Sequence, residues 1–70
     1  MTDARKVPRF ALETGVEVLA PALWAGRTGA VVRCFCPPAS APTSVLYFVQ
    51  LDGDRPGHPE AFFERELAPE

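Results

Sequence analysis

Eight prolines and five glycines lie within only 70 residues, and they constrain this chain more than any other feature of its sequence. Proline fixes φ and removes a backbone donor, and glycine favours turns, so together they interrupt long helices. The segments between them are short and rich in valine, leucine and phenylalanine. Because β-branched and aromatic residues favour strands, the sequence predicts an all-β fold built from short strands.

Five segments have the character of strands, and they are expected at 16–20, 29–36, 45–51, 61–63 and 67–69. In the third segment Tyr47, Val49 and Leu51 alternate with Leu46, Phe48 and Gln50, so the first set is predicted to face the core and the second set to face outward. Residues 64–66 are too few for an independent helix. They predict a single 3₁₀ turn before the last strand.

The second segment carries apolar residues on both of its faces. Val31, Arg33 and Phe35 share one face, and Ala30, Val32, Cys34 and Cys36 share the other. This pattern favours a β-bulge that exchanges the two faces midway. Phe35 and Phe48 would then form an outward apolar patch that needs cover, from the proline-rich loop, from the amino-terminal arm with Phe10, or from another protein.

Two loops connect the later strands. Asp52-Gly53-Asp54 follows an apolar run and predicts a chain reversal, because aspartate side chains bond to their own turn and glycine accepts positive φ. Pro37, Pro38 and Pro42 keep residues 36–44 out of a sheet, so this loop is expected to project from the body. Five short strands suit a closed or nearly closed small barrel, since closure removes exposed strand edges.

Length and charge indicate one small domain with a different amino-terminal segment. Residues 1–9 have a net charge of +2 and are predicted to be a flexible basic arm, whereas residues 10–70 form the predicted domain and have a net charge of −4. An acidic body argues against sequence-independent nucleic-acid binding. The sequence has no apolar run of ~20 residues and no secretory signal, so a cytoplasmic protein is expected, with no membrane partner.

Residues 12–32 contain Gly26-x-x-Gly29, in the stretch PALWAGRTGAVV, between two valine-rich segments. This arrangement resembles the KOW-type signature of SH3-like barrels. Residues 47–52 and 63–67 are similar to the third strand and to the closing turn and strand of such barrels. The resemblance implies a five-stranded SH3-like barrel, in which the two glycines meet backbone requirements of the turn.

The resemblance extends to two branches with different functions. KOW domains contact RNA or RNA polymerase, which implies an RNA- or DNA-binding domain. The second half is also similar to the electron-transport accessory group, which includes the photosystem I subunit PsaE, the variable subunit of ferredoxin-thioredoxin reductase and the nitrile hydratase β-subunit barrel. Those proteins are non-catalytic partners of larger enzymes. We therefore expect a non-catalytic protein–protein interaction module, and the alternative is a KOW-type nucleic-acid-binding domain.

The expected contact surface consists of Trp24, Arg27, Arg33, Phe35 and Phe48, together with the loop from Pro37 to Pro42. Trp24 has two interpretations. A large aromatic before the turn is expected to close the end of the core, but a loop tryptophan beside an arginine is also suited to anchoring a partner.

Cys34, Cys36 and His58 are the residues best suited to bind a metal, because thiolates and imidazole are preferred zinc ligands. A structural zinc site usually takes four ligands, with wider cysteine spacing. Half-buried free thiols and a solvated loop histidine are the preferred interpretation, and a metal or redox role stays open. The sequence has no recognisable catalytic motif, so no enzyme activity and no cofactor is predicted.

Overall fold

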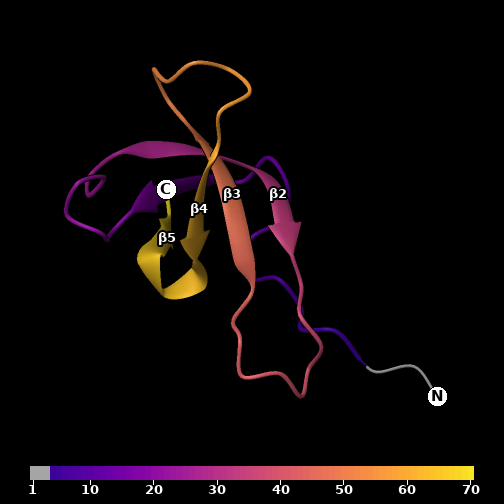
Figure 1. Ribbon diagram of the computed structural model, residues 1–70. Coiled ribbons are helices and arrows are strands. Elements are labelled where there is room, and N and C mark those ends of the chain that lie inside the picture. Colours follow the sequence, from indigo (N-terminus) through magenta and orange to yellow (C-terminus); the bar gives the residue numbers. More distant parts are fainter. Residues whose placement is uncertain (1–3) are drawn as a thin grey trace.

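In the computed structural model, which describes residues 4–70, the chain forms one antiparallel five-stranded sheet (Figure 1). Its elements are β1 (Gly15–Val18), β2 (Thr28–Phe35), β3 (Leu46–Leu51), β4 (Glu60–Phe63), η1 (Glu64–Glu66) and β5 (Leu67–Pro69). The strand order is β4-β3-β2-β1-β5. The predicted all-β class, the five strands and the 3₁₀ turn before the last strand are confirmed. The described residues contain no helix long and apolar enough to cross a membrane.

The sheet is open rather than closed into a barrel. Within residues 4–70, β4 pairs only with β3 and β5 pairs only with β1, so the sheet begins at one of these strands and ends at the other. The expected closure is therefore absent from residues 4–70, since no pairing joins β4 to β5. The two edge strands have four and three residues. Short edge strands also limit pairing with other chains, as closure of a barrel would.

The core lies on one face of this sheet. Its buried side chains are all apolar or aromatic, namely Phe10, Val16, Val18, Val31, Val45, Tyr47, Val49, Leu51, Phe62 and Leu67. In β3 the buried and half-buried positions alternate strictly, so Tyr47, Val49 and Leu51 face inward as predicted. Leu46, Phe48 and Gln50 therefore lie on the opposite face of the sheet.

A bulge in β2 changes which residues of this strand face the core. Val31 lies opposite Val49 and Arg33 lies opposite Phe48, so Val32 is an extra residue between the two pairs. Val31 is fully buried, whereas Val32 is 48% exposed. The predicted exchange of faces is confirmed, and it places Arg33 outside the core.

The two glycines of the Gly26-x-x-Gly29 turn are required for different reasons. Gly26 has a φ of +88°, in the region that favours glycine. Gly29 is buried where β2 approaches β3, and a Cβ at this position would collide with the carbonyl oxygen of Gln50 and lie 2.9 Å from the Cα of Leu51. Both predicted backbone requirements are confirmed.

Residues 4–9 run beside the proline-rich loop between β2 and β3, in the lower part of Figure 1. The Lys6 amide donates to the Pro37 carbonyl at 2.9 Å, and the Ala39 amide donates to the Ala4 carbonyl at 2.7 Å. The loop thus projects from the body, as expected, with these residues alongside it. The flexibility of the arm 1–9 stays a prediction, and residues 1–3 lie outside the described residues.

The Tyr47 hydroxyl joins three parts of the chain. It accepts hydrogen bonds from the backbone amides of Arg9, at 2.7 Å, and Phe10, at 3.4 Å, and it donates to the Glu64 carboxylate at 3.2 Å. The Phe10 ring packs edge-on against the Tyr47 ring, with 5.4 Å between their centroids. Burial raises the pKa of Tyr47 above its ordinary value of 10.0, and the nearby Glu64 carboxylate also raises it, against the opposing effect of the two amide donors.

We predict that Tyr47→Phe lowers the free energy of unfolding at pH 7 by about 1–3 kcal/mol, because buried donors lose their acceptor. The substitution also changes the pH dependence. Since folding raises the pKa of Tyr47, its stabilisation is complete below pH 10 and is lost as the pH rises through the folded-state pKa. Denaturant unfolding between pH 7 and about 11.5 measures both effects. Stability curves that stay parallel above pH 10 in the two proteins would contradict this account.

Candidate protein-interaction face

The face of the sheet opposite the core presents a row of three large apolar side chains across β2, β3 and β4. Phe35 lies directly opposite Leu46, and Leu46 lies directly opposite Phe63. Directly opposed residues of antiparallel strands point to the same face, and their side chains are in contact range. The three side chains therefore form one continuous apolar row.

A second row lies next to the first, one pleat further along the same strands. Arg33 is opposite Phe48, and Phe48 is opposite Ala61. Because i and i+2 in a strand share a face, this row faces the same way as the first. We call the two rows together the outer face, and it consists of Arg33, Phe35, Leu46, Phe48, Ala61 and Phe63.

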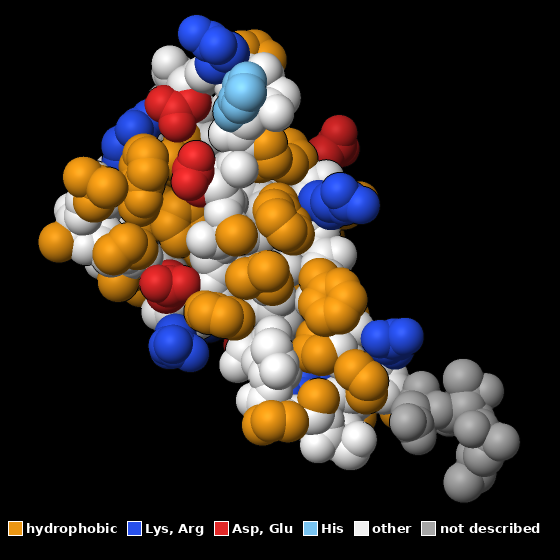
Figure 2. Space-filling view, in the orientation of Figure 1, with side chains coloured by type: hydrophobic (Ala, Val, Ile, Leu, Met, Phe, Trp, Pro, Cys, Tyr) orange, Lys and Arg blue, Asp and Glu red, His pale blue; other side chains and the backbone are white. Residues whose placement is uncertain are grey.

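The outer face is accessible in the folded chain. Phe35 is 53% exposed, Leu46, Phe48 and Phe63 are half-buried, and Figure 2 shows hydrophobic side chains gathered over β4, β3 and β2. No pocket or cleft is present in residues 4–70. The surface is thus shallow, which suits contact with a macromolecule better than enclosure of a small ligand.

Two segments that were expected to cover the patch formed by Phe35 and Phe48 lie elsewhere. Phe10 packs against Tyr47, on the core side of the sheet. The loop between β2 and β3 extends beyond the ends of both strands rather than across them (Figure 1). Neither of these two segments lies over the outer face within residues 4–70.

Positive charge lies on both sides of the apolar rows. Arg33 belongs to β2, and Arg65 in η1 places its guanidinium carbon 5.1 Å from the centroid of the Phe63 ring. Both arginines are exposed, and neither forms an ion pair within the described part of the chain. Two carboxylates adjoin Arg65 in η1. Glu64 accepts from the Tyr47 hydroxyl and Glu66 accepts from the Phe63 amide, and these neutral donors leave both negative charges in place.

The predicted contact residues fall into two groups. Arg33, Phe35 and Phe48 lie together on the outer face, as expected from the alternation. Trp24 and Arg27 both lie in the loop between β1 and β2, with 5.7 Å between the guanidinium carbon and the centroid of the indole ring. No contact joins these two groups among those that the structure gives for residues 4–70.

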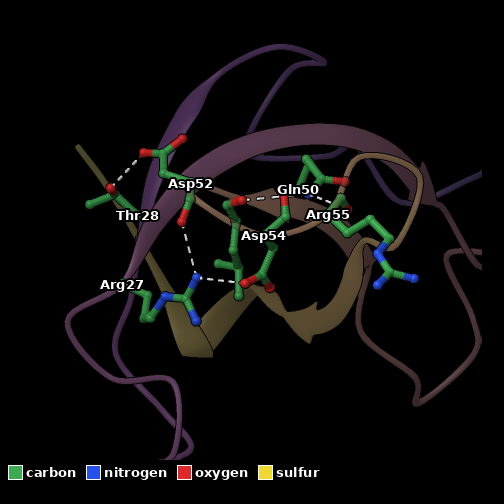
Figure 3. Close-up of polar contacts among 7 residues, drawn as sticks. Arg27, Thr28, Gln50, Asp52, Asp54 and Arg55 are labelled. Carbon is green, nitrogen blue, oxygen red and sulfur yellow. Dashed lines mark hydrogen bonds and ion pairs between the residues drawn. The ribbon is translucent and has the colours of Figure 1, made fainter.

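Arg27 holds two turns together rather than projecting freely into solvent (Figure 3). Its Nη2 donates to the Asp54 carboxylate at 2.9 Å and to the Asp52 carbonyl at 3.0 Å. The Asp52 carboxylate in turn accepts from the Thr28 hydroxyl at 2.8 Å. The Asp52-Gly53-Asp54 turn is confirmed, but the expected hydrogen bonds between its carboxylates and their own backbone are not among those of residues 4–70, since both carboxylates accept from the β1–β2 side instead. Trp24 is half-buried and packs against the core, which agrees with its capping interpretation.

Ala61, Phe63 and Arg65 were not among the predicted contact residues. A short strand that contains Phe62 and Phe63 in succession does not reveal which ring faces inward, and the structure buries Phe62. The contact of Arg27 with the turn after β3 could have been predicted from the sequence. In an antiparallel pair the start of one strand adjoins the end of the other, so a paired β2 and β3 bring Arg27 beside Asp52.

Cys34, Cys36 and His58, the residues considered for a metal site, do not lie together. Cys34 and Cys36 are free, half-buried and packed against the core, as interpreted from the sequence. Burial raises the pKa of the Cys34 thiol, and its hydrogen bond with Cys36 raises that pKa further. His58 is exposed in the loop after β3, at the opposite end of that strand from Cys36 (Figure 1). Residues 4–70 contain no group of three or more metal-ligating side chains placed to hold an ion.

Comparisons with protein-family models, with curated proteins and with solved structures found no match to this chain. The sheet topology and the outer face therefore carry the functional argument.

We predict a small energetic coupling between Arg27 and Asp54. Their side chains are 35% and 30% exposed, so solvent screening limits the ion pair to about 0.2–1 kcal/mol of stability. A double-mutant cycle with Arg27→Ala and Asp54→Ala, followed by denaturant unfolding, measures this coupling. The matched control replaces Arg27→Ala with Arg33→Ala, which is expected to show no coupling to Asp54. Equal coupling for both arginines would show that the contact in Figure 3 does not hold in solution.

Proposed function

We propose that this protein is a non-catalytic protein–protein interaction module that serves as a small accessory or regulatory subunit of a larger assembly. One observation carries the proposal, namely the continuous apolar outer face that β2, β3 and β4 present away from the core. Contiguous apolar surface bordered by polar residues is typical of interaction sites. The partner would bury Phe35 and Phe48 together with their neighbours.

The proposal also includes an SH3-like architecture. Five antiparallel strands in the order β4-β3-β2-β1-β5, with a 3₁₀ turn leading into the last strand, support it. The glycine requirements at Gly26 and Gly29 agree with the turn of the KOW-type signature. A cytoplasmic location stays a prediction from the sequence.

The non-catalytic role follows from the side chains that the outer face offers. Phenylalanine, leucine and alanine provide contact area, and arginine provides charge. None of these is a nucleophile or a general base at neutral pH, whereas acid–base and covalent catalysis need such groups. The chemistry of the face is thus that of recognition.

The second candidate function is nucleic-acid binding by a KOW-type domain. Arg33, Phe35 and Phe48 share the outer face, and aromatic rings beside an arginine can stack on unpaired bases. The net charge of −2 disfavours this function, because phosphate neutralisation by lysine and arginine supplies most nucleic-acid affinity. Trp24 and Arg27 stay predicted partner contacts, separate from the outer face.

Affinity capture from cells of the native organism tests the proposal. Wild-type protein is expected to retain a stoichiometric partner, and Phe35→Ala/Phe48→Ala is expected to lose it, since truncating central aromatic residues removes most binding energy. Leu12→Ala is the matched control, because Leu12 is 57% exposed but lies outside the outer face.

Circular dichroism confirms that each variant folds. If the double variant does not fold, the single variant Phe35→Ala replaces it in the capture experiment, because Phe35 is largely exposed. Retention of the same partner by a folded variant would contradict the proposed function.

A further inference from the structure

The shape of the outer face limits what can cover it. Three strands define its width, and strands are ~4.8 Å apart, so the face is ~10 Å wide. Two rows define its length, because residues i and i+2 are ~6.6 Å apart along a strand. An α-helix with its side chains is ~10–12 Å in diameter, so one helix lying on the sheet matches this width.

The face also offers no backbone hydrogen bonds to a partner. The amides and carbonyls of β3 pair with β2 and β4 in the plane of the sheet, and side chains alone project from its surface. A partner segment that loses water here must therefore bring backbone groups that are already paired. A helix meets this requirement, whereas an extended peptide would pair at a sheet edge instead.

The charges around the face select the partner further. Arg33 borders the apolar rows on β2, Arg65 borders them beside β4, and neither has an ion-pair partner within residues 4–70. Figure 2 shows Lys or Arg side chains on both sides of the hydrophobic group, with Asp or Glu side chains also present on its left. Carboxylates on both sides of an apolar stripe would complement this arrangement.

We propose that the outer face binds an amphipathic helix of its partner, whose apolar stripe covers Phe35, Leu46 and Phe48 and whose flanking Asp or Glu residues pair with Arg33 and Arg65. This inference rests on the proposed function and names the kind of partner segment. Affinity comes from burial of the phenylalanines, and the two ion pairs at the rim set the preference for acidic flanks.

A displayed peptide library tests the inference with the full-length protein. One half of the library carries helical peptides of about five turns (~18 residues) with a fixed apolar stripe and randomised flanking positions. The other half carries extended peptides with alternating apolar residues. Selection is run on wild type, on Phe35→Ala/Phe48→Ala and on Arg33→Glu/Arg65→Glu. The charge-reversed residues are exposed, so this last variant is expected to fold.

The expected result is enrichment of helical peptides with acidic flanks on wild type. Two rim ion pairs predict a roughly 2- to 30-fold preference for acidic over neutral flanks, which raised salt reduces. Arg33→Glu/Arg65→Glu is expected to reverse the preference toward Lys and Arg, and Phe35→Ala/Phe48→Ala is expected to lose enrichment altogether.

Helical binders with neutral or basic flanks on wild type would overturn the acidic part of the inference. Selection of extended peptides, or of no peptide that depends on Phe35 and Phe48, would overturn the claim that the partner segment is a helix. The proposed function would still stand if Phe35→Ala/Phe48→Ala loses the native partner in affinity capture. Two further controls are binding of oligo-dT and oligo-U at low salt and self-association in sedimentation. Oligonucleotide binding that depends on Phe48 would overturn both proposals in favour of nucleic-acid binding. Self-association that depends on Phe48 would overturn the helix proposal and identify a second copy of the chain as the occupant.

Discussion

The single-residue bulge at Val32 is the constraint on which the two faces of this sheet depend. Without an extra residue, β2 would continue to direct every odd-numbered side chain toward the core, and Arg33 would be buried beside Val31. Burying an unpaired guanidinium in an apolar core is strongly unfavourable. The bulge instead leaves Val32 partly exposed and sends Arg33 and Phe35 to the outer face. The same shift turns Cys34 inward, opposite Tyr47.

A chain of 70 residues can bury only a limited apolar surface, and this one has more than its core uses. Ten apolar or aromatic side chains fill the described core, with Phe10 closing it beneath Tyr47. Phe35, Leu46, Phe48 and Phe63 remain on the opposite face of the same strands. Val7, Leu12, Leu19 and Leu23 are exposed elsewhere on the chain, whereas these four side chains lie next to one another. That grouping is the observation that supports the proposed docking surface, since singly exposed hydrophobic residues are ordinary.

Local patterns in the sequence predicted much of this arrangement. The alternation in β3, the exchange of faces in β2, the two glycine requirements and the Asp52 turn are all consequences of strand geometry or turn chemistry that act within a few residues. Arg33, Phe35 and Phe48 were accordingly placed together. Features that depend on pairing between distant segments were harder to predict. The open edge between β4 and β5, the choice of Phe62 over Phe63 for the core, and the junction of Arg27 with Asp54 each need the register of the whole sheet.

The central claim is that the partner occupies the outer face, and NMR cross-saturation from the captured partner to the labelled full-length chain tests it most directly. The account predicts that saturation is transferred most strongly to residues 33–35, 46–48 and 61–65, which form or border that face. Transfer centred instead on residues 19–27, in the loop that carries Trp24, or on residues 4–9 beside the proline-rich loop would contradict it.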